Sequence, residues 1–254
     1  MAQPIDWAVY DAVLFDLDGV ITPTAAIHER AWTELFRDYD FTPADYLAYV
    51  DGKPRYDGVR SFLESRGVSL PDGHPDDPPG DDTVCAMGNK KNALFNDVLE
   101  RDGVAPYPGS LALMEVLDRL RVGQAIVSSS KNARAVLEVA GLGSRFAHVV
   151  DGTTLAAEGL DGKPAPDMFL RAAELLGSSP DRTVVVEDAV SGVAAGRAGG
   201  FALVVGVDRG GNREALTLKG ADVVVDDLSE TIHPVAASFG GVTETPPPDE
   251  ERPA

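Results

Sequence analysis

The sequence predicts an α/β fold, with a parallel sheet and an inserted helical domain. Short apolar runs alternate with amphipathic stretches along most of the chain, which is typical of a parallel sheet covered by helices on both faces. The runs are mostly Val, Leu, Ile and Ala, as expected for strands buried on both sides. Residues 25–102 break the alternation, because they show helical periodicity and no convincing strand.

The strands and helices can be assigned in order along the chain. The predicted strands are residues 12–15, 124–129, 148–151, 183–188, 201–207 and 222–227. The predicted helices between the later strands are residues 109–121, 132–142, 165–177 and 189–200. Such connecting helices allow successive strands to run parallel.

The domain organisation follows from this order. Residues 1–24 and 103–240 are expected to form the core domain, and residues 25–102 a helical cap over the carboxyl edge of the sheet. Within the cap, helices are expected in residues 27–39, 43–50, 57–67 and 89–103. Residues 70–82 are Pro, Gly and Asp with hardly an apolar residue, so they are expected to be a loop. The Pro-rich, charged residues 241–254 are expected to be a disordered tail.

The composition limits the partners. The 254 residues include 22 Lys and Arg against 41 Asp and Glu, a net charge of −19. We therefore expect no binding to nucleic acid or to a membrane, although local cations or a metal can hold a small anion in a cleft. The single cysteine, Cys85, allows no disulfide framework, and neither a signal-peptide pattern nor a membrane-spanning apolar run is present. We expect a cytoplasmic monomer.

Polar side chains gather where the predicted strands end, at the edge where open parallel sheets place their sites. They are Asp16 and Asp18 after the first strand, Ser128, Ser129 and Ser130 after the second, Glu187 and Asp188 after the fourth, and Lys163 in a loop before a helix. Each set alone has an ordinary explanation, such as an Asp-Gly turn or a serine helix cap. Together they give clustered carboxylates that repel one another unless a cation lies among them, and such oxygen ligands suit Mg²⁺.

This combination supports phosphoryl transfer. A carboxylate can accept a phosphoryl group as an aspartyl-phosphate. Mg²⁺ and a lysine can neutralise the phosphate oxygens. A second carboxylate two residues further on can act as general acid and base.

The same residues resemble the four motifs of the haloacid dehalogenase-like superfamily, in order. They are DLDGV at residues 16–20, SSS at 128–130, KPAPD at 163–167 and VVVEDA at 184–189. The resemblance covers nearly the whole chain except the tail and the 70–82 loop, and it implies a Rossmann-like core with a cap inserted after the first motif. Because the dehalogenases of the family lack the second aspartate, Asp18 points to phosphate chemistry.

The resemblance also implies a role for each motif residue. Asp16 would be the nucleophile and Asp18 the general acid and base. Ser128 would hold the transferring phosphate, and Lys163 would bridge phosphate and nucleophile. The implied ligands of Mg²⁺ are Asp16, Asp18 through its main-chain carbonyl, Glu187 and Asp188.

Closer features resemble the β-phosphoglucomutases, which interconvert β-glucose 1-phosphate and glucose 6-phosphate. The implied substrate-binding residues are Thr24, His28, Gly52, Arg55, Ser129, Lys131 and Asn132. NKKN (residues 89–92) and YPG (107–109) also match. His28 could instead be a surface residue, and Lys131 and Asn132 could be ordinary first-turn helix residues.

The cap loop departs from the mutase pattern. Asp51 stands at the position of a lysine, Gly58 at that of a serine, and Pro23 replaces an acidic residue. Arg55 could still bind the phosphate that is not transferred, and Lys53 could replace the missing lysine or be a solvent-exposed loop residue. The substrate is therefore less well predicted than the core chemistry.

Other functions remain open at this point. A phosphatase acting on a sugar phosphate or another small phosphate monoester would use the same core, with water attacking the aspartyl-phosphate. A phospho-acceptor receiver module also uses acidic residues, a hydroxyl and a lysine, but its acceptor lies on a middle strand and it has no cap. A dinucleotide-binding domain is disfavoured because no G-x-G-x-x-G follows the first strand.

Overall fold

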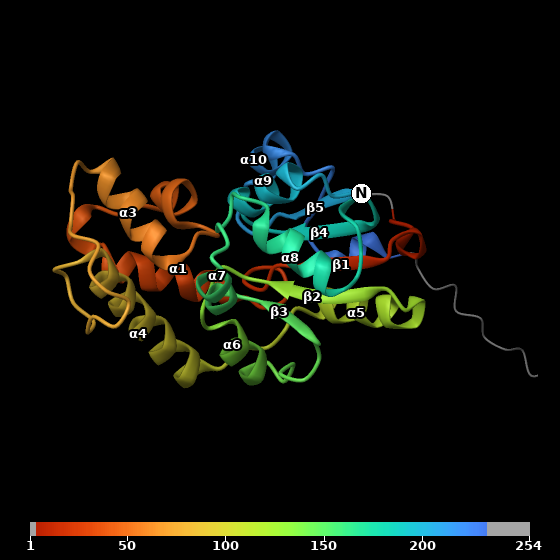
Figure 1. Cartoon of the computed structure of the whole chain (residues 1–254), viewed down its shortest axis with the longest axis horizontal. Helices are drawn as coiled ribbons and strands as arrows, with labels where there is room; N and C mark the ends of the chain where they lie inside the picture. Colours follow the sequence, from red (N-terminus) through yellow and green to blue (C-terminus); the bar gives the residue numbers. More distant parts are fainter. Residues whose placement is uncertain (1–3, 233–254) are drawn as a thin grey trace, which may run out of the picture.

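The computed structural model describes residues 4–232 (Figure 1). Its centre is a six-stranded parallel sheet in the order β3-β2-β1-β4-β5-β6. The strands are β1 (Ala12–Phe15), β2 (Gly123–Val127), β3 (His148–Val150), β4 (Thr183–Glu187), β5 (Leu203–Val207) and β6 (Val223–Val225). The predicted fold class and all six predicted strands are confirmed. The predicted tail, residues 241–254, lies outside the described residues.

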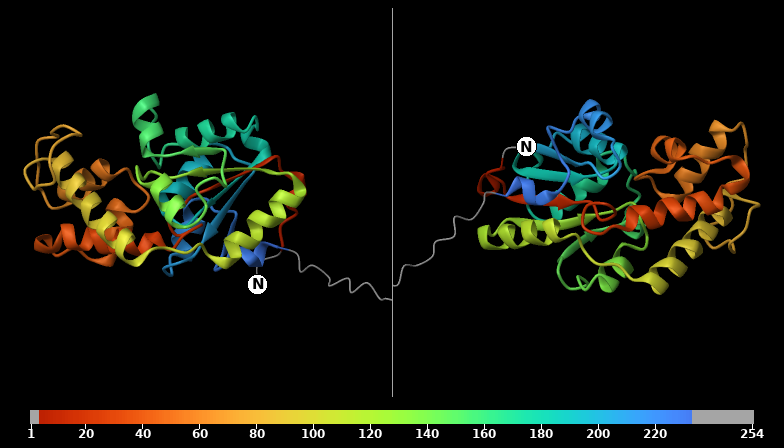
Figure 2. Two further views of the ribbon diagram at one scale, coloured as in Figure 1. Left: turned by 90° about the horizontal axis from the view of Figure 1, so that it is seen from below. Right: turned by 180° about the vertical axis from the view of Figure 1, so that it is seen from behind.

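Helices cover both faces of the sheet (Figure 2). They are α5 (Pro108–Leu120), α6 (Ala133–Val139), α7 (Gly152–Glu158), α8 (Asp167–Leu175), α9 (Val190–Ala198) and α10 (Arg213–Lys219). Short 3₁₀ turns are η1 (Trp7–Val9), η4 (Pro180–Arg182) and η5 (Leu228–Thr231). The helices predicted at α5, α6, α8 and α9 are confirmed, whereas α7 and α10 were not predicted from the sequence pattern.

Successive residues of the central strand point to opposite faces and are buried on both, as the apolar runs predict. Val13 and Phe15 pack in the apolar cluster beneath α5 and α6. Leu14, between them, packs in the cluster beneath α8. The period of two along the strand produces this division.

The chain between β1 and α5 forms helices that lie at one end of the core (Figures 1 and 2). They are α1 (Thr24–Leu35), η2 (Arg37–Tyr39), α2 (Pro43–Asp45), the π-helical turn η3 (Tyr46–Val50), α3 (Arg55–Ser65) and α4 (Val84–Asp102). We call residues 24–102 the cap. It has its own apolar cluster, in which the Phe36 ring packs against Trp32 and Phe62. The exact division into domains stays a prediction.

The order of the strands places the site. β1 lies between β2 and β4, with Phe15 paired to Ile126 on one side and Val186 on the other. The chain therefore leaves these three neighbouring strands at the same edge, where the direction of strand order reverses and α/β proteins bind ligands. The cap lies over this edge.

Two further features concern the described residues. No helix of residues 4–232 is long and apolar enough to cross a bilayer. Residues 70–82 contain no helix or strand, as predicted, and the Asn89 side-chain amide of α4 donates hydrogen bonds to the main-chain oxygens of Pro75 and Asp77.

Candidate active site

Asp16 follows β1 directly and is buried beside a buried lysine. Lys163 Nζ donates hydrogen bonds to Asp16 Oδ1 at 2.5 Å, to Glu187 Oε1 at 2.5 Å and to the main-chain oxygen of Val127 at 3.1 Å. Burial disfavours the charge of Lys163, but Asp16 and Glu187 raise its pKa above the ordinary value. The lysine is therefore a fixed cation that joins the ends of β1, β2 and β4.

A third carboxylate, that of Asp188, lies beside Asp16 and Glu187. Ligand oxygens of Asp16, Glu187 and Asp188 lie within 4.8 Å of one another. Burial, and then the neighbouring carboxylates, raise the pKa of Asp188 well above its ordinary value. This excess of buried negative charge and the oxygen donor set fit a divalent cation. Asp16 and Asp188 would hold it, with Glu187 shared between it and Lys163.

Asp18 lies beside these groups, but its side chain is held by the cap and by β2. Thr24 Oγ1 donates a hydrogen bond to Asp18 Oδ1, His28 Nε2 lies 3.3 Å from the same oxygen, and Ser128 Oγ donates to Oδ2 at 3.4 Å. Burial alone would raise the pKa of Asp18, but His28, Thr24 and Lys91 lower it to about 2. The side chain is ionised and faces the pocket, and metal binding through its main-chain carbonyl stays a prediction.

His28 is not a surface residue, because its ring is stacked on Phe95 at 4.1 Å between centroids. Its Nδ1 accepts a hydrogen bond from Lys91 Nζ, which leaves Nε2 to carry the ring proton toward Asp18. Burial lowers the pKa of Lys91 to about 7 and also lowers the pKa of His28. Lys91, His28 and Asp18 thus form a line of titratable groups that leads from the cap to the core.

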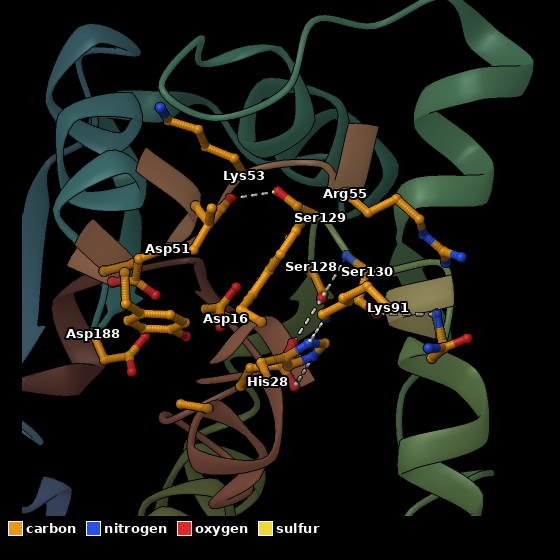
Figure 3. A pocket seen from close by; sticks show the side chains of 18 of the residues that line it. Asp16, His28, Asp51, Lys53, Arg55, Lys91, Ser128, Ser129, Ser130 and Asp188 are labelled. Atoms are coloured by element: carbon orange, nitrogen blue, oxygen red, sulfur yellow. Dashed lines mark hydrogen bonds and ion pairs between the residues drawn. The ribbon is translucent and has the colours of Figure 1, made fainter. Parts of the chain in front are cut away.

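The serine motif connects the end of β2 to the cap (Figure 3). Ser128 is buried and its hydroxyl accepts a hydrogen bond from the Ser130 main-chain N–H at 3.1 Å. Ser129 Oγ donates to the Gly52 main-chain oxygen in the cap at 2.8 Å. Asn132 Nδ2 donates to Asn92 Oδ1 in α4 at 2.6 Å. Asn132 is therefore more than a first-turn helix residue.

The cap loop lies directly over the core. Ser191 Oγ of the core donates to the Asp51 main-chain oxygen at 2.9 Å. Gly52 has φ of +68°, and a Cβ there would lie 2.3 Å from Ser191 Oγ, so no side chain fits. The carboxyl group of Asp51 lines the pocket, where burial and the nearby Glu187 raise its pKa to about 7.

The basic residues of the cap loop point in different directions. Arg55 lines the pocket at the start of α3. Lys53 Nζ donates to Ser61 Oγ at 3.0 Å, and Figure 3 shows it pointing away from Asp16. Lys131 is exposed, does not line the pocket, and places its Nζ 5.4 Å from the centroid of the Tyr56 ring in the cap. Arg55 and Lys53 thus both line the pocket, whereas Lys131 does not.

Gly58, at the position of the mutase serine, has a packing role. It lies in α3 against the Trp32 ring, and a Cβ added to it would lie 3.1 Å from two ring carbons. A serine side chain would therefore press on the core of the cap. This departure from the mutase pattern follows from the packing around Trp32.

The pocket between cap and core has a volume of about 60 Å³, well below the usual range of small-molecule sites, so the cap closes tightly over it. Nine of the predicted residues line it: Asp16, Asp18, His28, Gly52, Arg55, Ser128, Ser129, Asn132 and Asp188. Thr24, Lys163 and Glu187 support these residues from behind.

Comparison with known proteins identifies the family. The model of the haloacid dehalogenase-like hydrolases matches residues 10–200. The chain belongs to the haloacid dehalogenase-like hydrolase family. A β-phosphoglucomutase of Mycobacterium bovis is 51% identical over 238 residues, 87% of this chain and 91% of the relative. Hexitol phosphatase A of Escherichia coli is 32% identical over 189 residues, covering 74% of this chain and 78% of the relative. The crystal structure of a β-phosphoglucomutase from Clostridium difficile has a TM-score of 0.71 at 27% identity, covering 87% and 92% of the two chains.

The pocket of this family member also contains side chains that the strand-end pattern alone does not single out. Lys91 belongs to a recognised stretch, NKKN, but only the fold brings its Nζ to His28, 63 positions away in sequence. Tyr46 and Asn92 also line the pocket, from η3 and α4. None of these positions follows a strand, which is the signal that identified the core residues.

Proposed function

We propose that this protein is a Mg²⁺-dependent phosphotransferase that interconverts β-glucose 1-phosphate and glucose 6-phosphate through phosphorylated Asp16. When bound, Mg²⁺ neutralises charge on the phosphoryl oxygens. The Ser128 hydroxyl and the main-chain N–H groups that follow it would hold the transferring phosphoryl group, and Lys163 would balance its charge. Arg55 would bind the phosphate that stays on the sugar.

The protonation of Asp18 sets the order of steps. Because the pKa of Asp18 is about 2, this carboxylate can take up a proton but has none to give in the resting enzyme. Expulsion of a sugar oxygen requires a proton, so the cycle starts from phosphorylated Asp16. A sugar-phosphate hydroxyl attacks phosphorus, its proton passes to Asp18, and the bond between phosphorus and Asp16 breaks to give a sugar bisphosphate.

The second half of the cycle reverses these movements. The sugar bisphosphate turns round so that its other phosphoryl group reaches Asp16. Asp16 attacks this phosphoryl group, and the bond between phosphorus and the sugar oxygen breaks. Asp18 returns its proton to that oxygen, which leaves phosphorylated Asp16 and the isomerised sugar phosphate. The Lys91–His28 pair would hold Asp18 in place and tune its proton affinity.

The observation that carries this proposal is the contact of Asp18 with the cap. Thr24 and His28, both on α1, hold the carboxyl group that must exchange protons with the sugar. Three hydrogen bonds, from Ser129, Asn132 and Ser191, join cap and core around the pocket and would keep water from phosphorylated Asp16. The 51% identity to a β-phosphoglucomutase supports the same choice of acceptor.

A second candidate is a phosphatase on a sugar phosphate, favoured by Asp51. A carboxyl group at this position removes the positive charge that the mutase pattern places beside the phosphate site, and with a pKa of about 7 it is negatively charged in part of the molecules at neutral pH. Weaker binding of the sugar phosphate would give water more time to attack. The relatives that are named phosphatases are compatible with this alternative.

One assay separates the two candidates. The protein with Mg²⁺ is given β-glucose 1-phosphate, with and without catalytic glucose 1,6-bisphosphate, and glucose 6-phosphate and inorganic phosphate are measured together. Glucose 6-phosphate that forms fast, depends on the bisphosphate and is accompanied by little inorganic phosphate is the expected result. Inorganic phosphate without isomerisation would contradict the mutase and favour the phosphatase.

A further inference from the structure

The loop after β5 contacts the turn that carries the first motif. Arg209 Nε donates a hydrogen bond to the main-chain oxygen of Gly19 at 2.8 Å, and Arg209 Nη1 donates to the main-chain oxygen of Asp226 at 3.0 Å. Gly19 directly follows Asp18 and has φ of +87°. One guanidinium group therefore joins the turn after β1 to the chain after β6.

The same loop also contacts the chain after β4. Asn212 Nδ2 donates to the main-chain oxygen of Asp188 at 3.1 Å. The loop is itself fixed, because Asp208 Oδ1 accepts hydrogen bonds from the main-chain N–H groups of Gly211 at 2.7 Å and Asn212 at 3.0 Å. Arg209 and Asn212 thus hold, from one short segment, both loops that carry the clustered carboxylates.

The surroundings of Arg209 fix its orientation. Its guanidinium carbon lies 3.8 Å from the centroid of the Tyr107 ring, a stacking arrangement that arginine favours. The Tyr107 main-chain N–H in turn donates to the Ile21 oxygen at 2.8 Å, so the ring is tied to the same motif-bearing segment. Arg209 Nη2 is buried without a hydrogen-bond partner among residues 4–232. Nε and Nη1 are therefore the hydrogen-bonding donors of this side chain.

The spacing between the two loops is narrow. A Cβ added to Gly19 would lie 1.7 Å from Asp188 Oδ2, so the carboxyl group of Asp188 lies directly against the Gly19 main chain. Main-chain positions in both loops determine how far apart the oxygens of Asp16 and Asp188 lie. Partners one step removed from metal ligands commonly set metal affinity in this way.

We propose that Arg209 and Asn212 are positioning residues of the divalent-metal site, an inference that rests on the metal dependence in the proposed function. They fix the position of the Gly19 turn relative to the Asp188 main chain. The oxygens of Asp16, Glu187 and Asp188 can then bind one cation. Neither residue lines the pocket or touches the carboxylates themselves.

The test is the affinity of the substrate-free protein for Mn²⁺, measured by titration calorimetry for Arg209→Ala, Arg209→Lys and Asn212→Ala. We expect Arg209→Ala and Asn212→Ala to weaken Mn²⁺ binding about tenfold or more. Arg209→Lys should recover part of the loss, because an ammonium can reach one carbonyl but cannot hold two with a fixed fork. Arg182→Ala is the matched control, since Arg182 is exposed and its side chain binds the Asp11 carboxylate, just before β1, without contacting Gly19 or Asp188.

The outcomes are distinct. Wild-type Mn²⁺ affinity in both alanine variants, even with a lower melting temperature, would overturn the positioning role and leave a structural one. Wild-type protein that binds no Mn²⁺ would overturn both this inference and the metal dependence. Because no substrate is present, weaker Mn²⁺ binding by the variants would support the inference even if no sugar phosphate were turned over.

Discussion

The Ser129 hydroxyl of the core donates a hydrogen bond to the main-chain oxygen of Gly52 in the cap, with the two oxygens 2.8 Å apart. Ser129 is the neighbour of Ser128, the proposed phosphate-binding residue, and Gly52 is the neighbour of Asp51 in the cap loop. The closed position of the cap is thus coupled to the loop that would hold the phosphoryl group. Closure and phosphate binding should therefore support each other.

We expect Ser129→Ala to favour opening of the cap. Loss of one such hydrogen bond is worth about 1 kcal/mol, or about fivefold in the closure equilibrium. The ratio of inorganic phosphate to glucose 6-phosphate formed from β-glucose 1-phosphate should rise by a similar factor. Ser178→Ala, which removes a hydroxyl bonded to Thr183 away from the pocket, is the control and should leave the ratio unchanged.

Substitutions of the two aspartates of the first motif should have different effects on activity. Asp16→Asn should lower every phosphoryl-transfer rate by about 10³-fold or more, because it removes the nucleophile. Asp18→Ala should abolish turnover of sugar phosphates but retain phosphorylation of Asp16 by acetyl phosphate, whose leaving group needs no proton. Intact mass of the protein reports the second effect. Full activity of Asp16→Asn would show that the site is assigned wrongly.

Arg55 should affect only those reactions in which the sugar carries a phosphate that is not being transferred. Arg55→Ala removes a charged hydrogen-bond donor, so KM for β-glucose 1-phosphate in the mutase reaction should rise about 10- to 100-fold. Phosphorylation by acetyl phosphate, which carries no second phosphate, should be unchanged. Exposed Arg37→Ala in the cap serves as the control. Equal loss with both phosphate donors would contradict the assigned role.

The lowered pKa of Lys91 predicts that the stability of the fold depends on pH. Its pKa falls from 10.5 to about 7 on folding because it is buried, so between these values the unfolded chain binds more protons than the folded one. The free energy of unfolding should therefore rise with pH from about 7 to 10.5, by a few kcal/mol relative to Lys91→Met. Urea unfolding of both proteins across this range measures the difference. Parallel curves for the two proteins would contradict the shift.

Local signals predicted the core of the site because each residue follows its own strand or precedes its own helix. Asp16, Ser128 and Glu187 lie at the ends of apolar runs, and parallel strands bring such ends together. The four motifs in their order were enough to predict that Lys163 lies beside them. The structure confirms that these groups converge, with Lys163 bonded to both Asp16 and Glu187.

The remaining features depend on packing between distant segments. The contact of Lys91 with His28 joins α4 to α1, and that of Arg209 with Gly19 joins residues 190 positions apart. Gly58 matched no functional pattern because its small size is set by the Trp32 ring. Helices α7 and α10 each bury a single residue, so they lack the i, i+3, i+4 apolar pattern that Ala133, Val136 and Leu137 give the equally short α6. Asp151 nevertheless caps α7 through the N–H groups of Thr153 and Thr154.

The fate of the phosphoryl group on Asp16 tests the central claim most directly. The protein is phosphorylated with ³²P-labelled acetyl phosphate, freed of excess donor and mixed with β-glucose 1-phosphate in a single turnover. We predict that the label appears in glucose 1,6-bisphosphate and glucose 6-phosphate faster than it appears as inorganic phosphate. Release of the label as inorganic phosphate at the same rate with and without the sugar would contradict transfer to a sugar hydroxyl.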